Sequence, residues 1–270
     1  MMRPSYRSGY ARHGGEAMHP SLWQGIDHAW IPGLGNTGLT LRDVVGSSHG
    51  TVGASVDWTT DTTEHDGLGK ATDAISVGLQ DYAGKSGTIM SIARSNITID
   101  NDYKWLISRN DAGDNAGDCS LFYDEPSNKM AWLIQTGSGT TKIQSGVTGI
   151  PAKKTVYCGT WSPRQLEYFE DGESQGTGTA RELFAHPAWG FAIAQESTEY
   201  QSNNFLWDGG IYFTAFWNRV LSLPEIRLFN HDHMALVRLR PRVFATAGAA
   251  PPAGGDGAAM YHHLQNLGVY

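Results

Sequence analysis

Four carboxylates lie close together near the middle of the chain, and paired carboxylates are the catalytic groups of glycoside hydrolysis. They are Glu167, Glu170, Asp171 and Glu173. A retaining hydrolase holds its two carboxyl groups roughly 5 to 5.5 Å apart, and a strand points residues two or four positions apart to one face. Glu167 and Glu170 are three positions apart, so a strand directs them to opposite faces. The segment therefore indicates a solvated hairpin tip rather than a catalytic pair.

A second segment has the composition of a calcium-binding loop. Its oxygen donors are Asp111, Asp114, Asn115 and Asp118. Calcium takes about six to eight oxygen ligands, but the segment lacks the ligand order and the final glutamate of an EF-hand loop. A connection between two strands, rich in Gly and Asp, explains it equally well. One Ca²⁺ site stays open as an alternative, and no other cofactor is predicted.

Histidines occur in two close sets, His231 with His233 and His262 with His263. On a helix, residues two positions apart are turned about 200° from each other, which suits one metal ion poorly. We expect packing at a surface or an interface for both sets. No Ser-His-Asp spacing, phosphate-binding loop or dinucleotide-binding glycine pattern is visible. We therefore predict that the chain is not an enzyme.

The nine tryptophans are the remaining candidates, because aromatic faces stack on sugars. The ones on alternating, strand-like runs are predicted to lie in the core: Trp105, Trp132, Trp161 and Trp217. The ones in loop-like segments are the predicted sugar contacts: Trp58, Trp189 and Trp207. Loop Asn and Asp groups would complete the recognition of a sugar.

Composition narrows the class of protein. Of 270 residues 33 are glycine and only 17% are charged, and the formal net charge is −7. Many glycines and few charges favour a sheet protein with many turns. The acidic balance gives no general attraction to nucleic acid or anionic lipid, and no apolar run approaches the roughly 18 residues that span a bilayer. We therefore expect neither nucleic-acid nor membrane partners.

The positioning elements are short apolar or alternating runs separated by turn residues, from Leu22 onward, which is typical of an all-β sandwich. Asp171-Gly172 is a predicted hairpin tip, because Gly tolerates the positive φ of a tight turn. One helix is expected after Ser222, where Glu225 completes a capping box and Pro224 lies in the first turn. Cys119 and Cys158 are the only cysteines. A reduced protein is the simpler interpretation, and whether they pair stays open.

Both ends differ from this body in composition. Residues 1–20 are predicted to be an arm, 21–243 a sandwich, 244–257 a linker rich in Ala, Gly and Pro, and 258–270 a short helix or docking segment. Isolated helices of about 11 residues do not persist in water, so we expect the ends to bind neighbouring molecules. The predicted docking residues are Arg3, Tyr6, Arg7, Tyr10, Met260, Leu264, Leu267 and Tyr270.

Several motifs in order resemble a laminin-G-like domain of the concanavalin A-like lectin and glucanase group. They are residues 39–44 (LTLRDV) with 48–52 (SHGTV), 159–161 (GTW) with 166–172 (LEYFEDG), and 208–211 (DGGI) with 216–222 (FWNRVLS). The likeness covers about residues 22–235. It implies an antiparallel two-sheet jelly-roll sandwich with one short C-terminal helix and extended terminal arms.

A narrower resemblance concerns the two ends of that region. Residues 19–25 (HPSLWQG), 29–30 (AW) and 33–43 (GLGNTGLTLRD), with 238–242 (RLRPR), are similar to laminin-G-like proteins of tailed phages. This implies a virion structural protein, on the capsid or the tail, made in the host cytoplasm. Its partners would be other virion proteins, copies of itself in a homo-oligomer, and a host glycan. A carbohydrate-binding adhesin module is the alternative, and a glycoside hydrolase is less favoured.

Overall fold

The computed structural model describes residues 10–34, 38–54, 56–59, 62–66, 75–79, 83–96, 103–109, 118–136, 139–179, 182–183, 190–195 and 206–241. The chain divides into two units, Met1–Arg240 and Pro241–Tyr270. Only Pro241 of the second unit is described, so the predicted linker 244–257 and terminal segment 258–270 lie outside the described residues. All the described helices and strands belong to the first unit.

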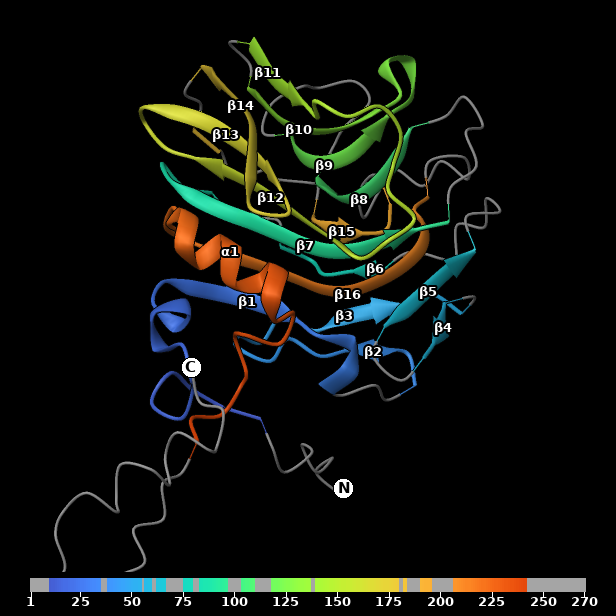
Figure 1. The fold of residues 1–270 in the computed structure, drawn as a ribbon. Helices are drawn as coiled ribbons and strands as arrows, with labels where there is room; N and C mark the ends of the chain where they lie inside the picture. The colour runs from blue at the N-terminus through green and yellow to red at the C-terminus, as the bar shows by residue number, and fades with distance from the viewer. Residues whose placement is uncertain are drawn as a thin grey trace, which may run out of the picture. The chain divides into compact units, whose positions relative to one another are not determined.

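Two antiparallel sheets form a sandwich, which confirms the predicted fold class (Figure 1). The first sheet has the order β14-β13-β12-β7-β16-β5-β4, and β1 also pairs with β16. Its strands are β1 (Ile26–Trp30), β4 (Asp57–Trp58), β5 (Thr63–Asp66), β7 (Gly87–Ser95), β12 (Thr155–Trp161), β13 (Gln165–Glu170), β14 (Glu173–Thr179) and β16 (Asp208–Trp217). The side of β16 that faces away from β7 pairs with two strands. Its first half pairs with β5 and its second half pairs with β1.

The second sheet has the order β11-β10-β9-β8-β15-β6-β3-β2. Its strands are β2 (Thr40–Leu41), β3 (Gly50–Val52), β6 (Ile75–Ser76), β8 (Lys104–Arg109), β9 (Asp118–Asp124), β10 (Lys129–Thr136), β11 (Gly139–Gln144) and β15 (Ala192–Ile193). One α-helix, α1 (Leu223–His231), and the short 3-10 helices η1 (Pro20–Trp23), η2 (Pro32–Leu34) and η3 (Glu125–Ser127) complete the described elements.

Large side chains fill the space between the two sheets, and glycines make room for them. The rings of Trp132 and Trp161, both fully buried, lie 6.3 Å apart. A Cβ added at Gly159 would lie 2.3 Å from the Trp132 ring, and one at Gly87 would lie 2.3 Å from the Trp161 ring. The glycine of the GTW motif is therefore a packing requirement of the core.

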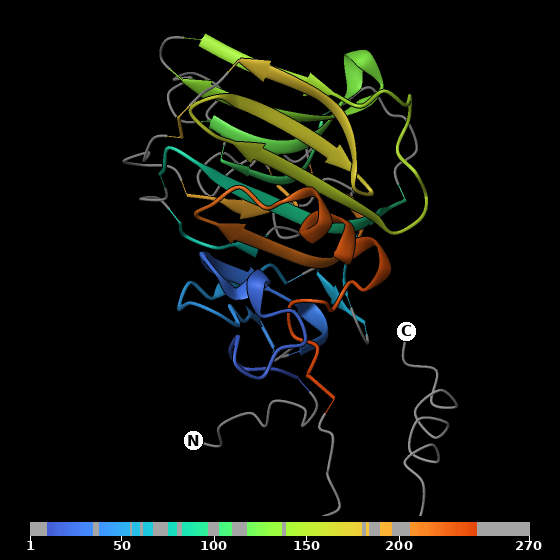
Figure 2. The same ribbon diagram turned by 60° about the vertical axis from the view of Figure 1, so that its left-hand side comes forward.

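The outer face of the first sheet is covered by the chain itself. Met90 and Phe213, from β7 and β16, belong to an apolar cluster with Ile226 and Phe229 of α1 and Leu22 of η1. Figure 2 shows α1 lying along this sheet, as does Figure 1. The sheet is thus buried on both faces, and this explains why β7 and β16 are apolar at consecutive positions rather than alternating.

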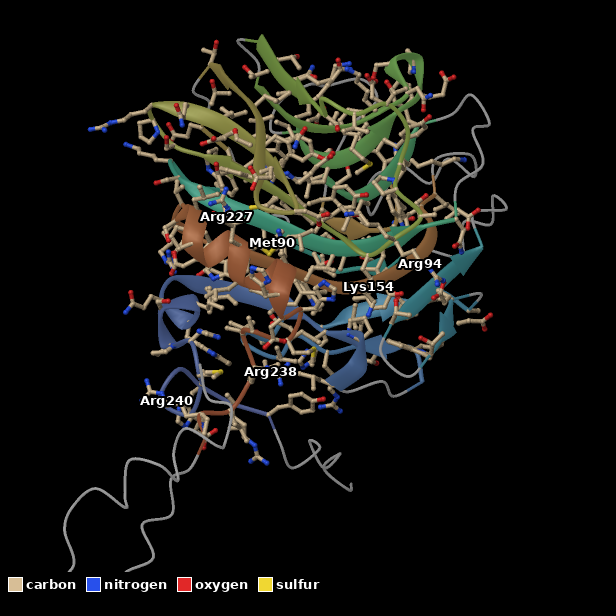
Figure 3. The ribbon with its side chains drawn as sticks, in the orientation of Figure 1. Met90, Arg94, Lys154, Arg227, Arg238 and Arg240 are labelled. Carbon is tan, nitrogen blue, oxygen red and sulfur yellow. The ribbon has the colours of Figure 1, made fainter. Side chains whose placement is uncertain are left out.

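The described part of the predicted N-terminal arm packs on its own chain. Tyr10 forms a β-bridge with Arg238, and Ala17, which is fully buried, forms one with Leu239. Arg240, labelled with Arg238 in Figure 3, donates from Nε to the carbonyl of Ala17 at 2.8 Å. Residues 10–20 therefore pack on the rest of the first unit, whereas residues 1–9 of the expected arm lie outside the described residues. Tyr10 packs against the cluster around α1.

A buried carboxylate organises the loop that follows β2. Asp43 accepts a hydrogen bond from His28 Nδ1 at 2.6 Å, and its own amide donates to His49 Nδ1. Four backbone amides also donate to the Asp43 carboxylate, at 2.9 to 3.2 Å: those of Ala29, Val45, Gly46 and Ser48. Burial raises the pKa of Asp43, but these hydrogen bonds outweigh it and hold the pKa below its ordinary value. The aspartate of the LTLRDV motif is therefore a structural centre.

The predicted hairpin tip and helix start are both present. Asp171 and Gly172 have φ of 48° and 74°, which both central positions of a type I′ turn require. Glu225 accepts from the Ser222 amide at 2.9 Å and from both terminal nitrogens of Arg219. Burial raises the pKa of Glu225, but the hydrogen bonds from Arg219 and Ser222 lower it to about 2. From α1, Arg227 (Figure 3) donates to the Gly172 carbonyl at 3.2 Å.

The two cysteines are free and buried in different clusters. Cys119 lies in the core between the sheets, and Cys158 lies in the cluster beneath α1. They therefore do not pair. Burial raises the pKa of both thiols well above the ordinary value, so neither is a reactive thiolate near neutral pH.

We expect Gly159→Ala to destabilise the protein, because the new methyl group overlaps the Trp132 ring. Overpacking of a core typically lowers the free energy of unfolding by about 1–3 kcal/mol. Urea denaturation followed by tryptophan fluorescence measures the change. Gly84→Ala is the matched control, since its Cβ would meet the nearest atom at 3.5 Å. Equal stability of the two variants would contradict this account of the core.

We expect Asp43→Asn to lower the free energy of unfolding by about 1–3 kcal/mol at neutral pH, because the amide cannot replace all the accepted hydrogen bonds. The folded pKa of Asp43 lies below the unfolded value of about 3.9. Its stabilisation is therefore present above that value and lost as pH falls through the folded pKa. Denaturation curves from pH 7 to pH 2 should converge for wild type and variant at the acid end. Asp57→Asn, at an exposed site, should change little throughout.

Candidate functional site

The outer face of the second sheet carries side chains that the core does not use. Along β9 and β10 every second side chain points inward. These inward side chains belong to the core: Cys119, Leu121, Tyr123, Met130, Trp132 and Ile134. Phe122 and Ala131, which lie between them in sequence, form a separate cluster with Trp105 of β8. Because neighbours on a strand point to opposite faces, this cluster lies on the face turned away from the first sheet.

Three aromatic rings are packed together on this outer face. The ring centroids of Trp105 and Phe122 are 4.5 Å apart. Tyr103 lies 6.2 Å from Trp105 in a stacked arrangement and 6.1 Å from Phe122. Trp105 is 6% exposed and Phe122 is 2% exposed, whereas Tyr103 is 36% exposed. Tyr103 is therefore an accessible ring resting on a buried aromatic base.

The indole N–H of Trp105 has no hydrogen-bond acceptor among the described residues, although it is buried. A buried donor without an acceptor costs free energy. Such a group is uncommon in folded proteins and calls for an explanation. The aromatic cluster therefore holds an unused donor in addition to its apolar faces.

A polar cluster borders the aromatic rings. Asp124, at the end of β9, is only 2% exposed, and its Oδ2 accepts hydrogen bonds from three side chains. These donors are Ser127 at 2.6 Å, Lys142 at 3.0 Å and Gln144. Gln144 also donates to Ser127 Oγ at 2.8 Å. The carboxylate is thus held in one position by residues of β11 and of η3.

Strand register brings the two clusters together. Asp124 follows Phe122 by two positions on β9, so both point to the outer face. Lys104 pairs with Tyr123, and Trp105 pairs with Phe122. Tyr103 immediately precedes β8, and its ring lies against Trp105 and Phe122. The exposed aromatic ring therefore contacts a residue that lies two positions before the fixed carboxylate on β9.

The arrangement provides the two interactions by which proteins bind sugars. An aromatic face packs against the apolar C–H face of a pyranose or furanose ring. Carboxylate, amide and ammonium groups then exchange hydrogen bonds with its hydroxyl groups. Tyr103 supplies the first, and Asp124, Lys142 and Gln144 supply the second. Residues 103–105, 122–127 and 142–144 are the candidate site.

The structure does not bring the three predicted sugar-contact tryptophans together. Trp207 is fully buried, lies in the core and donates to the Arg94 carbonyl at 3.3 Å, so the prediction that it contacts a ligand is wrong. Trp207 immediately precedes β16, whose residues Ile211 and Phe216 belong to the same core cluster. The loop-like composition around Trp207 does not reveal this. Trp58 is half-buried in β4 on the first sheet and donates to Gly38. Trp189 lies outside the described residues.

The clustered carboxylates are separated as the spacing predicts. Glu167 accepts from Ser174 Oγ at 2.7 Å on the outer side of β13. Glu170 accepts from the Tyr168 hydroxyl at 2.7 Å and from Ser145 at 3.0 Å, on the side of the core residue Tyr168. Burial raises the pKa of Glu170, and its hydrogen bonds only partly oppose this. The two glutamates do not form a pair across a common space.

Most of the predicted metal and docking residues lie outside the described part of the chain: Asp111, Asp114, Asn115, Arg3, Tyr6, Arg7, Met260, Leu264, Leu267 and Tyr270. Asp118 is described and is buried as the first residue of β9. Within the described residues no group of three or more His, Cys, Asp or Glu side chains is placed to hold a metal ion. In the same part of the chain no helix is long and apolar enough to cross a membrane.

Sequence reasoning missed the candidate site because it assigned Trp105 to the core. The signal was present in the spacing. Tyr103 and Trp105 are two positions apart, as are Phe122 and Asp124, so each pair shares a face on a strand. The ambiguity lies in which face is inward, since both faces of β8 and β9 carry large apolar side chains.

Comparison with solved structures finds several proteins with a region of similar fold. The sialidase of Trypanosoma rangeli in complex with sialic acid matches with a TM-score of 0.54 and 15% identity, over 78% of this chain and 33% of the sialidase. Domain 4 of AbnA, a GH43 extracellular arabinanase of Geobacillus stearothermophilus, in complex with arabinotriose, matches with a TM-score of 0.61 and 11% identity, over 76% and 98%. The receptor-binding domain of botulinum neurotoxin D matches with a TM-score of 0.59 and 14% identity, over 77% and 53%.

These matches establish the fold and correct one prediction. The chain spans about one third of the sialidase that it matches. No protein family and no curated protein matches the sequence. The prediction that the chain is not an enzyme is contradicted, because the similar structures include a sialidase and a domain of an arabinanase. The narrower assignment to laminin-G-like proteins of tailed phages stays a prediction.

Proposed function

We propose that the chain is a carbohydrate-binding module whose site is the outer face of the second sheet. The observation that carries the proposal is the position of Tyr103, which is 36% exposed, stacked on Trp105 and in contact with Phe122, two positions before the fixed carboxylate of Asp124 on β9. An accessible aromatic ring next to an acceptor-rich cluster suits a sugar ring, which has an apolar face and a rim of hydroxyl groups.

The distribution of apolar surface supports this choice of face. The outer face of the first sheet is covered by α1, η1 and residues 234–237, so it offers no comparable aromatic platform among the described residues. On the second sheet the aromatic cluster has few described apolar neighbours besides Ala131 and Leu133. A sugar bound to the outer face of the second sheet would cover the exposed ring of Tyr103.

The similar structures support the proposal at the level of the fold. Domain 4 of the arabinanase is matched over 98% of its length and is a complex with arabinotriose. A ligand-binding domain of botulinum neurotoxin D is a complex with N-acetylneuraminic acid, at 15% identity and a TM-score of 0.56. One sandwich serves many functions, so the residues of the site carry the assignment for this chain.

We expect Tyr103→Ala to reduce glycan affinity about tenfold or more, because the stacking surface is lost. A glycan array identifies ligands, and isothermal titration calorimetry measures their affinity for wild type and variant. Tyr103→Phe keeps the ring and should retain most of the affinity. Leu223→Ala removes an exposed apolar side chain from α1, away from the site, and serves as the control. Unchanged affinity in Tyr103→Ala would exclude this face.

A place in a tailed-phage virion is our second proposal, and it is supported by the sequence resemblance of residues 19–43 and 238–242. A host glycan would then be the ligand, and neighbouring virion proteins or further copies of the chain would bind the ends. We expect deletion of residues 246–270 to leave the sandwich folded, as judged by circular dichroism, and to abolish attachment to the particle. Normal incorporation of the truncated protein would contradict this proposal.

A further inference from the structure

Arg42, which directly follows β2, has no partner for its charge among the described residues. The side chain is half-buried, and its Nε is buried without an acceptor. The two terminal nitrogens also lack a partner in that part of the chain, but they are not buried in the same way. Taking a charge out of water without a partner costs free energy. Four other arginines accordingly pair with carboxylates: Arg94, Arg219, Arg227 and Arg238.

The neighbouring carboxylate does not neutralise Arg42. Asp43 accepts hydrogen bonds from His28 and from four backbone amides, and none of these donors is Arg42. Leu41 belongs to the core between the sheets, and Asp43 is only 2% exposed. Because successive side chains of an extended chain point to opposite sides, the guanidinium group points away from both.

The side to which the guanidinium group points carries hydroxyl groups. Thr40 precedes Arg42 by two positions and pairs with Thr51 of β3, which is exposed. Thr51 pairs in turn with Ser76 of β6. This is the outer face of the second sheet, because Val52, next to Thr51, belongs to the core. Short side chains with hydroxyl donors therefore line the face on which Arg42 lies.

His49 adds a second donor close to this arginine. Its Nδ1 accepts a hydrogen bond from the amide of Asp43 at 3.1 Å, so the ring lies beside the residue that follows Arg42. A neutral imidazole that accepts at one nitrogen carries its proton on the other. The Nε2–H of His49 is therefore a donor, and the residue is exposed.

We propose that Arg42 and His49 bind an oxyanion, that is, a carboxylate, sulfate or phosphate group of a ligand, on the outer face of β2 and β3. The planar guanidinium group presents paired N–H donors that match two oxygens of such a group. His49 Nε2–H and the Thr51 hydroxyl donate to its remaining acceptor positions. Strands β6 and β15 separate β3 from β8 in the sheet order, so this site is distinct from the one at Tyr103 and goes beyond the proposed function.

The first test uses the wild-type, full-length protein. Sodium phosphate, sodium sulfate and sodium glucuronate are titrated separately, and NMR follows the Nε–H of Arg42 and the ring of His49. Sodium chloride at equal ionic strength controls for screening, which acts on every exposed charge. We expect saturable shifts with a Kd of about 1 mM or tighter for at least one anion. The tightest of the three identifies the kind of oxyanion, and no saturable shift with any of them would overturn the inference.

The second test removes the guanidinium group. Arg42→Gln should weaken the tightest anion about tenfold or more. Arg164→Gln removes the same charge at an exposed position between β12 and β13 and should leave the affinity unchanged. Equal affinity of Arg42→Gln and wild type contradicts the proposal. If Arg42→Gln does not fold, Arg42→Lys decides, because it keeps the charge, loses the planar pair of donors and should still weaken binding.

The third test isolates the histidine. His49→Asn keeps an acceptor for the Asp43 amide but loses the Nε2–H donor, so it should weaken binding about threefold or more without unfolding the loop. Circular dichroism and the Asp43 amide resonance check that the loop is intact. Unchanged affinity in a folded His49→Asn would overturn the role of His49.

The outcomes separate this inference from the proposed function. Oxyanion binding that Arg42→Gln abolishes, in a protein that binds no glycan on the array, supports the inference and overturns the proposed function. Glycan binding that requires Tyr103, without any oxyanion binding at Arg42, does the reverse.

Discussion

Each sheet of a sandwich has an inner and an outer face, and the rest of this structure depends on how the chain covers the outer ones. Residues 10–34 and 221–237 lay their apolar side chains on the outer face of the first sheet. That sheet is buried on both sides, and its strands β7 and β16 are buried at nearly every position. On the second sheet no described helix forms such a cover, and the outer face carries a compact cluster in which Trp105 and Phe122 are buried and Tyr103 is 36% exposed. The candidate site is a consequence of this asymmetry.

Charged side chains hold this cover in place. Arg219, which follows β16, donates to the carbonyls of Gln24 and Ser21 and to both oxygens of Glu225. It thus joins η1, the end of β16 and the start of α1 through one guanidinium group. Asp43 does the same for β1 and the loop after β2. Charge-assisted hydrogen bonds of this kind are stronger than neutral ones, so Asp43 and Arg219, which belong to the motifs that carry the family resemblance, stabilise the fold.

The chemistry of the candidate site comes from a few neighbouring side chains. Tyr103 is accessible because Trp105 and Phe122 form a base beneath it, and Asp124 is fixed because Ser127, Lys142 and Gln144 all donate to one of its oxygens. A preorganised site loses less conformational freedom when a ligand binds. The similar structures include enzymes and receptor-binding domains, so the fold alone does not choose between these functions.

The features that could be predicted from the amino-acid sequence are local ones. The short alternating runs, the Asp171-Gly172 turn and the Ser222 cap are set by neighbouring residues, and each was predictable from them. The face to which a side chain points follows from the period of a strand, which is why Glu167 and Glu170 were correctly separated. Which of the two faces is inward depends instead on the packing of the sheets. Trp207 lies in the core and Trp105 in an outer cluster because sheets pair residues far apart in sequence, and the identity of the covered face is settled only when the whole chain has packed.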